Sequence, residues 1–144
     1  MKRRRRLQQP LGGLAQRVKG LWEQFRQKKV GLDRRNELIA ETHSLLKSHY
    51  KEMSAKHDCS RIVQAILKNG TAQMRRDIWL ELSGDVLALS KDEYAHPVLA
   101  KLLRYGGAPA KEGVRLAFRG HAVRAMTHAR AAVVLEEGLQ RGWS

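Results

Sequence analysis

Residues 57–70, HDCSRIVQAILKNG, carry the polar side chains with the clearest capacity to bind a ligand. Helical periodicity of about 100° per residue puts Ser60, Arg61, Gln64 and Lys68 on one face and leaves the aliphatic residues on the opposite face. The aliphatic face is suited to burial, and the polar face offers hydrogen-bond donors and acceptors. The segment therefore predicts a helix that packs on one side and binds a partner on the other.

Other residue types suggest catalysis or metal binding, but their spacing supports neither. Cys59 follows His57 and Asp58, yet adjacent residues point in different directions, and we interpret this thiol as a packed side chain at a structural turn. The six histidines lack the Cys/His spacing of a zinc site, and the sequence has no glycine-rich phosphate loop or paired-carboxylate motif. We therefore expect no catalytic residue, no metal, no cofactor and no small-molecule substrate.

Positive charge is concentrated at the start of the chain. The sequence has 28 Lys and Arg against 14 Asp and Glu, a formal charge of +14, and residues 1–35 alone carry a net charge of +10. This balance favours a polyanion such as nucleic acid or an anionic membrane surface. Because no apolar run reaches the roughly 20 residues that span a bilayer, we expect nucleic acid as the partner and no membrane.

The opening MKRRRR predicts a signal for nuclear import or a nucleic-acid contact. A disordered solubilising tail is an equal alternative, and a mitochondrial transit peptide is another, although four contiguous arginines and a first serine at Ser44 are unlike most transit peptides. The single cysteine, Cys59, excludes an intrachain disulfide and fits a reducing compartment.

A repeat of 36 residues runs through most of the chain. Residues 53–70, 89–106 and 125–142 align without gaps, and apolar residues match at a fixed helical phase. The glycines in register are Gly70, Gly106 and Gly142, together with Gly84 and Gly120. A glycine after the last periodic residue is typical of a left-handed helix cap, so we expect that conformation at Gly70.

Each repeat predicts three short helices. In the first repeat these are a brief helix at 50–55, a middle helix at 60–69 after a turn at 57–58, and a third helix from Thr71 to Gly84. The second repeat follows the same plan at 95–105 and 108–118. Ahead of the repeats we expect a helix at 14–29 interrupted at Gly20, and a helix at 33–47 with Asp33 as its N-cap.

These elements predict an all-α fold in which the repeats stack into a curved α-solenoid with a continuous core. We divide the chain into a flexible basic leader at 1–20, N-terminal capping helices at 21–52 and repeats at 53–88, 89–124 and 125–144. The last repeat is incomplete. Either a partner covers its apolar edge, or the chain is a piece of a longer array.

The motif SRIVQ at 60–64, on the middle helix of a 36-residue three-helix repeat, resembles the base-reading motif of Pumilio (PUF) repeats. That resemblance implies a right-handed, armadillo-like superhelix. It also implies that Ser60 and Gln64 bond the Watson–Crick edge of a base, adenine for this pair, while Arg61 stacks between bases. His96 is the one polar group at the matching positions of the second repeat.

Five segments together resemble one branch of that family, the nucleolar Puf-A type. They are LWEQFRQKK at 21–29, KHDCSRIVQ at 56–64, LSKDEY at 89–94, the Tyr105–Gly106 pair and FRGHAVRAMTHA at 118–129. The resemblance covers about residues 21–142. It implies RNA or DNA binding through basic surfaces with little base preference, a nuclear and nucleolar location, precursor or mature ribosomal RNA as partner alongside ribosome-assembly proteins, and a role in large-subunit assembly.

Phosphate contacts must supply most of the affinity of such a chain. Only the first repeat has a full base-reading triad, and each base contact contributes about 1–3 kcal/mol, whereas micromolar binding needs about 8 kcal/mol. The candidate phosphate-contacting residues are Arg3, Arg4, Arg5, Arg6, Lys28, Lys29, Arg34, Arg35, Lys68, Arg75, Arg76 and Arg104. We interpret Trp22 and Trp79 as core anchors. The alternative is an armadillo- or HEAT-type solenoid that binds a peptide and carries a nuclear address.

Overall fold

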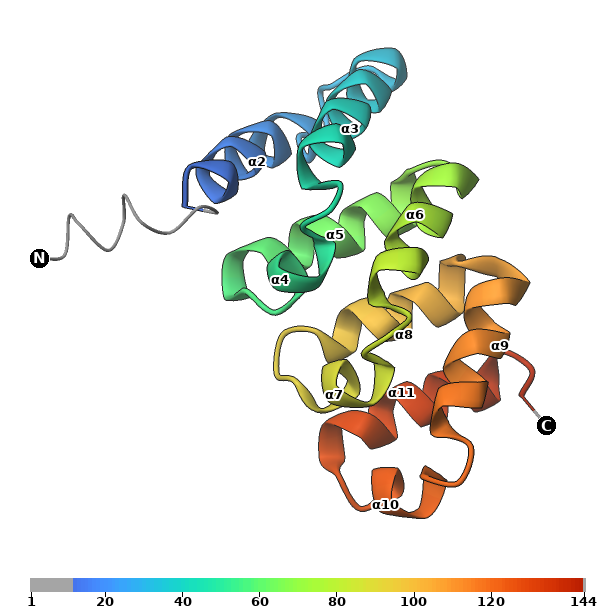
Figure 1. Ribbon diagram of the computed structural model, residues 1–144. Coiled ribbons are helices and arrows are strands. Elements are labelled where there is room, and N and C mark those ends of the chain that lie inside the picture. The colour runs from blue at the N-terminus through green and yellow to red at the C-terminus, as the bar shows by residue number, and fades with distance from the viewer. Residues whose placement is uncertain (1–11, 144) are drawn as a thin grey trace, which may run out of the picture.

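The computed structural model describes residues 12–143, and this part of the chain is a stack of helices with no strand (Figure 1). The helices are α2 (Gly12–Phe25), α3 (Leu32–Leu46), α4 (Tyr50–Ser54), α5 (His57–Asn69), α6 (Ala72–Leu82), α7 (Val86–Lys91), α8 (His96–Tyr105), α9 (Gly107–Phe118), α10 (Ala122–Met126) and α11 (Ala129–Gln140). None of these ten helices is long and apolar enough to cross a membrane.

The 36-residue repeat predicted from the sequence is confirmed. The short first helices α4, α7 and α10 begin at Tyr50, Val86 and Ala122, each 36 residues after the previous one. The middle helices α5, α8 and α11 pack side by side down the stack, and the third helices α6 and α9 follow one edge (Figure 1). The fold is the predicted α-solenoid.

One continuous core holds the repeats together. The equivalent residues Ile62, Val98 and Val134 on the three middle helices are completely buried. Their neighbours join a single cluster that extends from α2 to α11. Because each middle helix buries its aliphatic face against the next one, no repeat has a separate core.

Helices α2 and α3 form an incomplete repeat. Helix α2 packs on α5 in the way that α5 packs on α8 and α8 on α11, so it takes the place of a middle helix. Helix α3 takes the place of a third helix. The Arg35 side chain from its first turn donates a hydrogen bond to the Phe25 carbonyl at 3.2 Å, just as Arg75 from α6 donates to the Leu67 carbonyl at 2.7 Å.

The predicted break at Gly20 is wrong, and α2 also crosses the boundary that we placed between residues 20 and 21. Residues 12–20, assigned to a flexible leader, are helical. The helix is held because Val18 is completely buried against the core. Gly20 lies on the exposed side, where a Cβ atom would meet nothing within 4 Å, so it neither bends nor ends the helix. The remaining boundaries stay predictions.

Two helix starts also differ from the prediction. The middle helix α5 begins at His57, so the turn expected at 57–58 is its first helical turn. The N-cap of α3 is Gly31, and Asp33 lies inside the helix. Asp58 and Asp33 both occupy the first turn, where a carboxylate interacts favourably with the positive end of the helix dipole.

Gly70 does not adopt the predicted left-handed conformation, because its backbone is extended with φ −83° and ψ −174°. Glycine is needed at this position because a side chain would clash with the backbone of the preceding turn. A Cβ atom at Gly70 would lie 2.5 Å from the Ile66 carbonyl oxygen, and one at Gly106 would lie 2.5 Å from the Leu102 carbonyl oxygen. Of the three glycines in this register, Gly142 has a positive φ, 103°.

A buried polar group connects the incomplete repeat to the first full one. His43 from α3 is only 8% exposed. Its Nε2 atom lies 3.0 Å from a carboxylate oxygen of Asp77 on α6, and its Nδ1 atom lies 2.5 Å from the hydroxyl of Tyr50 on α4. In the neutral ring Nε2 donates to Asp77 and Nδ1 accepts from Tyr50, so three helices share one hydrogen-bond chain.

Candidate nucleic-acid interface

Ser60 lies on the middle helix α5 but is buried, with only 4% of its surface exposed. Its hydroxyl donates a hydrogen bond to the Tyr94 carbonyl oxygen at 2.5 Å and accepts one from Gln64 Nε2 at 3.0 Å. The hydroxyl hydrogen is therefore used within the fold. In this structure Ser60 joins α5 to the next repeat and orients Gln64, and its predicted contact to a base stays a prediction.

Gln64 and Arg61 are the more accessible members of the predicted triad. Gln64 is half-buried, and its hydrogen bond to Ser60 uses one of its two amide hydrogens. Its carbonyl oxygen and second amide hydrogen are the donor and acceptor pair that can read a base edge. Arg61 is exposed on the neighbouring position of the helix. The base contacts predicted for these two side chains stay predictions.

His96 is half-buried at the start of α8, and its Nδ1–H donates to the Asp92 carbonyl oxygen at 2.9 Å. The Asp92 carboxylate accepts hydrogen bonds from the backbone N–H groups of Tyr94 and Ala95 at 2.9 and 2.8 Å. This turn replaces the first helical turn seen in α5, so α8 starts later in its repeat. That bond leaves Nε2 as the ring nitrogen of His96 for a partner, and the base contact predicted for His96 stays a prediction.

Three of the predicted phosphate-contacting residues are engaged within the fold. Arg35 donates to the carbonyl oxygens of Phe25 and Gln27, so it satisfies backbone groups at the end of α2. Arg75 does the same at the end of α5, and its guanidinium also lies over the Tyr105 ring at 5.8 Å. Arg34 forms an exposed ion pair with Glu37 at 3.0 Å.

Five others are exposed and have no carboxylate within 4.0 Å among residues 12–143: Lys28, Lys29, Lys68, Arg76 and Arg104. Lys68 and Arg104 lie in the last turns of α5 and α8, 36 residues apart, so they occupy the same place in successive repeats. Cations are favoured at helix C-termini, where the backbone carbonyls carry partial negative charge. Arg3, Arg4, Arg5 and Arg6 lie outside the described residues.

Ion pairs between neighbouring elements lie at the opposite ends of the middle helices. Lys19 from α2 lies 2.6 Å from Asp58 at the start of α5. Hydrogen bonding to Lys19 lowers the pKa of Asp58, and the same bond raises the pKa of Lys19. Arg130 from α11 lies 4.0 Å from Glu93 near the start of α8. Lys56 and Lys91 are also exposed near these ends and form no ion pair among residues 12–143. The C-terminal edge differs in that its cations repeat at equivalent positions, and we call it the basic edge, defined by Lys68 and Arg104.

Trp22 and Arg26 belong to this region and were missed by the sequence reasoning. Trp22 is only half-buried on α2, and the Arg26 guanidinium lies 4.7 Å from the centroid of its ring. The apolar stripe that contains Trp22 correctly indicated packing, but it carried no sign that one side of the ring stays open. Trp79, in contrast, packs against Gly113 as a core anchor.

The candidate thiol chemistry has no support in the structure. Cys59 is 1% exposed, and burial raises the pKa of its thiol above the ordinary value. His57 points instead to Asp58, with Nδ1 2.9 Å from a carboxylate oxygen. Among residues 12–143 no group of three His, Cys, Asp or Glu side chains is placed to hold a metal ion.

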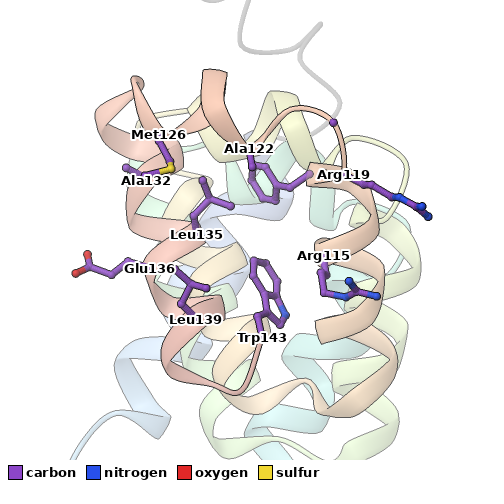
Figure 2. Close-up of a pocket in the computed structure, with 11 residues that line it drawn as sticks. Arg115, Arg119, Ala122, Met126, Ala132, Leu135, Glu136, Leu139 and Trp143 are labelled. Carbon is purple, nitrogen blue, oxygen red and sulfur yellow. The ribbon is translucent and has the colours of Figure 1, made fainter.

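A separate apolar groove of about 580 Å³ lies between α9, α10 and α11 (Figure 2). Figure 2 shows Trp143 between Leu139 and Arg115, while Glu136 points outward from α11. The Trp143 indole N–H donates to the Lys111 carbonyl oxygen at 3.2 Å. Glu136 occupies in the third repeat the position that Gln64 occupies in the first. The third repeat therefore has a carboxylate where the first repeat has an amide, and it lies beside an apolar surface.

Comparison with known proteins gives one consistent set of matches, although no family model matches the sequence. The chain is 31% identical over 141 residues to Pumilio homology domain family member 6 of Schizosaccharomyces pombe, a match that covers 97% of this chain and 22% of that protein. A crystal structure of human Puf-A in complex with DNA superposes with a TM-score of 0.81 and 28% identity, over 86% of this chain and 25% of the other.

A third match shows the fold alone. The Puf3 RNA-binding domain, bound to a recognition sequence from the Cox17 RNA 3′ untranslated region, superposes with a TM-score of 0.72 at 21% identity over 78% of this chain and 32% of the other. The chain spans about a fifth of the length of the curated relatives it matches. None of these three matches supports the armadillo or HEAT alternative.

Proposed function

Because this chain is a Pumilio (PUF) repeat protein of the Puf-A type, we propose that it binds RNA mainly through phosphate contacts along the basic edge of its middle helices. The observation that carries the proposal is the repeated placement of Lys68 and Arg104, which are exposed and have no carboxylate partner among residues 12–143. Two cations at equivalent places in successive repeats give a regular track that a phosphodiester backbone can follow.

The surroundings of the basic edge support this assignment. Lys28 and Lys29 follow α2, the first helix in the row, and Arg76 extends the edge on α6. The ion pairs of Lys19 and Arg130 lie at the other ends of the middle helices, so they do not cancel this charge. The basic edge therefore keeps its positive charge, at helix ends that favour cations.

Base reading contributes less in this proposal. Gln64 and Arg61 can contact one base, with adenine as the base that the Ser60–Gln64 pair favours, and His96 adds one further polar group. Each such contact contributes about 1–3 kcal/mol, which leaves most of the affinity to phosphate contacts. The chain then binds many RNA sequences with similar affinity.

We place this binding in assembly of the large ribosomal subunit, in the nucleolus, with precursor or mature ribosomal RNA as the ligand. The likeness to the Puf-A branch supports the placement, and ribosome-assembly proteins are the expected neighbours. Ultraviolet crosslinking in cells that express the tagged chain should recover ribosomal RNA sequences above messenger RNA. Recovery of messenger RNA alone would contradict the role in ribosome assembly, but it would leave the proposal of phosphate-dominated RNA binding unaffected.

A salt titration tests the binding mode. The logarithm of the affinity for a labelled single-stranded RNA of mixed sequence should fall linearly with the logarithm of the salt concentration. The slope should be steeper by about 0.7 for each phosphate that the chain neutralises. The double variant Lys68→Ala with Arg104→Ala should bind severalfold more weakly, and its slope should be smaller by about 1.4, because two phosphate contacts are lost.

The matched control is Arg115→Ala with Arg141→Ala, which removes two cations that are already paired with Glu112 and Glu137. This control should keep the slope of the unmodified chain. Gln64→Ala should scarcely change affinity for mixed RNA, whereas replacing Arg3, Arg4, Arg5 and Arg6 should lower it severalfold. Binding that does not depend on salt, or equal slopes for the two double variants, would contradict the proposal.

A further inference from the structure

Trp22 borders open space beside cationic residues, whereas Trp143 borders the apolar groove between α9, α10 and α11. The Trp79 ring is seated against Gly113 and the Trp143 ring against Gly138, so closely that a Cβ atom at either glycine would lie 2.1 or 2.2 Å from the ring. Trp22 lines three hollows, one of about 670 Å³ at the end of α2 and two of about 270 and 230 Å³ between α2 and α5. Its ring is half-buried, which fixes its position while part of its surface stays accessible.

The hollows next to Trp22 differ in charge. The largest one is lined by Trp22, Arg26, Gln27, Lys28 and Lys29, with three cations and no carboxylate among these residues. In the hollow on the α5 side, Lys19 and Arg61 are balanced by Glu23 and Asp58. One side of the ring therefore suits an anion, and the other suits a polar group without net charge.

An unpaired nucleotide fits this arrangement. Its base is flat, polar and uncharged, and its phosphates are anionic, so a base over Trp22 places the adjoining phosphates beside Lys28 and Lys29. The Arg26 guanidinium, 4.7 Å from the ring centroid, already shows that a planar group is accommodated there. Arg26 is exposed but is paired with Glu23 at 3.2 Å, so it must leave that ion pair to move aside or to cover the second face of a base.

Arg61 extends the same site toward the base-reading face of α5. It lines the hollow on the α5 side together with Trp22, three residues before Gln64 on the same helix. A strand that leaves Trp22 in that direction reaches Gln64 and then the basic edge. The three features lie in one path from α2 across α5 to α8.

We propose that Trp22 is a stacking platform for an unpaired base at the start of the nucleic-acid path, with Lys28 and Lys29 holding the neighbouring phosphates. The inference rests on the proposed function and adds strand selectivity to it. Bases in a duplex are stacked on one another, so a duplex cannot use the platform without extruding a nucleotide, whereas a single strand can.

The test compares Trp22→Leu with the unmodified chain on three ligands of equal length: a labelled oligouridine, the same strand with abasic positions, and a duplex. Loss of one base–aromatic stack should weaken binding to the oligouridine by about 5- to 150-fold. Binding to the abasic strand and the duplex should not change, and the salt slope should stay the same, because no phosphate contact is removed. Trp22→Phe, which keeps a ring, should retain most of the affinity.

Trp143→Leu is the matched control, since it removes a tryptophan from the other end of the chain and should leave all three affinities unchanged. If Trp22→Leu fails to fold, the double variant Arg61→Ala with Gln64→Ala takes its place, because without those two side chains the chain must still bind the oligouridine more tightly than the abasic strand. Equal affinities for those two strands, or equal losses on single strand and duplex, would overturn the platform while the salt-dependent binding stands. Absence of any nucleic-acid binding would overturn the proposed function and the platform together.

Discussion

The hydroxyl of Ser60 donates to the carbonyl oxygen of Tyr94 over 2.5 Å, and this bond joins the middle helix of one repeat to the turn that starts the middle helix of the next. Tyr94 also places its ring against His57 at 5.3 Å in an edge-on arrangement. The residue that family resemblance assigns to a base is therefore also part of the seam between repeats.

Ser60→Ala should destabilise the chain by about 1–2 kcal/mol, because the Tyr94 carbonyl loses a partner at a partly buried position. Urea unfolding followed by circular dichroism measures this loss. Affinity for mixed RNA at a temperature where the variant is folded should stay within about twofold of the unmodified chain, since phosphates carry the binding. A large loss of affinity without loss of stability would instead assign Ser60 to the base.

Glycine substitutions should have opposite effects at two helical positions. Gly113→Ala places a methyl group 2.1 Å from the Trp79 ring, so the ring or α9 must shift, and overpacking of this kind costs about 1–3 kcal/mol. Gly20→Ala in the exposed interior of α2 meets nothing within 4 Å and should stabilise by about 0.5–1 kcal/mol. Thermal melts of both variants check the signs, and a stabilised Gly113→Ala would mean that Trp79 is not seated there.

The sequence was sufficient to predict the helical repeat, but it was insufficient to predict which cations are exposed and which bond to the backbone. Periodicity predicts the helices because burial of Ile62, Val98 and Val134 repeats every 36 residues. Arg75 and Arg76 look alike in the sequence, yet one caps α5 and the other is exposed. Their difference comes from the 100° step between neighbours on a helix and from the position of a carbonyl on another element, which composition does not encode.

The incomplete first repeat was also invisible in the sequence. Helices α2 and α3 share few letters with the later repeats, and the boundary at residue 20 fell inside α2. The hidden signal is an arginine at the fourth position of two third helices, Arg35 in α3 and Arg75 in α6. Both arginines donate hydrogen bonds to backbone carbonyls at the end of the preceding helix. This capping contact therefore repeats in the incomplete repeat, although the aliphatic pattern does not.

Asp77→Asn should reduce the acid sensitivity of the fold. The hydrogen bond from Gln73, followed by the one from His43, lowers the pKa of Asp77 below its unfolded value. The unfolded chain therefore binds a proton more readily, so the stability that Asp77 contributes is complete above about pH 4 and is lost as pH falls through the folded pKa. The variant should melt lower at pH 7 and lose less stability between pH 5 and pH 3 than the unmodified chain.

The control for that experiment is Glu41→Gln, at an exposed position in the interior of α3 without an ion pair among residues 12–143. It should follow the pH dependence of the unmodified chain. Identical pH curves for Asp77→Asn and Glu41→Gln would show that the His43–Asp77 contact does not stabilise the fold.

The apolar groove at α9, α10 and α11 should make the 144-residue chain bind a hydrophobic dye and self-associate at high concentration. Leu139 is 64% exposed beside Trp143, and Met126 is 69% exposed on α10, so a contiguous apolar surface faces solvent. Leu139→Lys should lower dye fluorescence and shift sedimentation toward monomer. Leu80→Lys is the matched control, because Leu80 is 65% exposed on α6 and does not line the groove. Equal effects of the two lysines would assign the association to net charge and not to the groove.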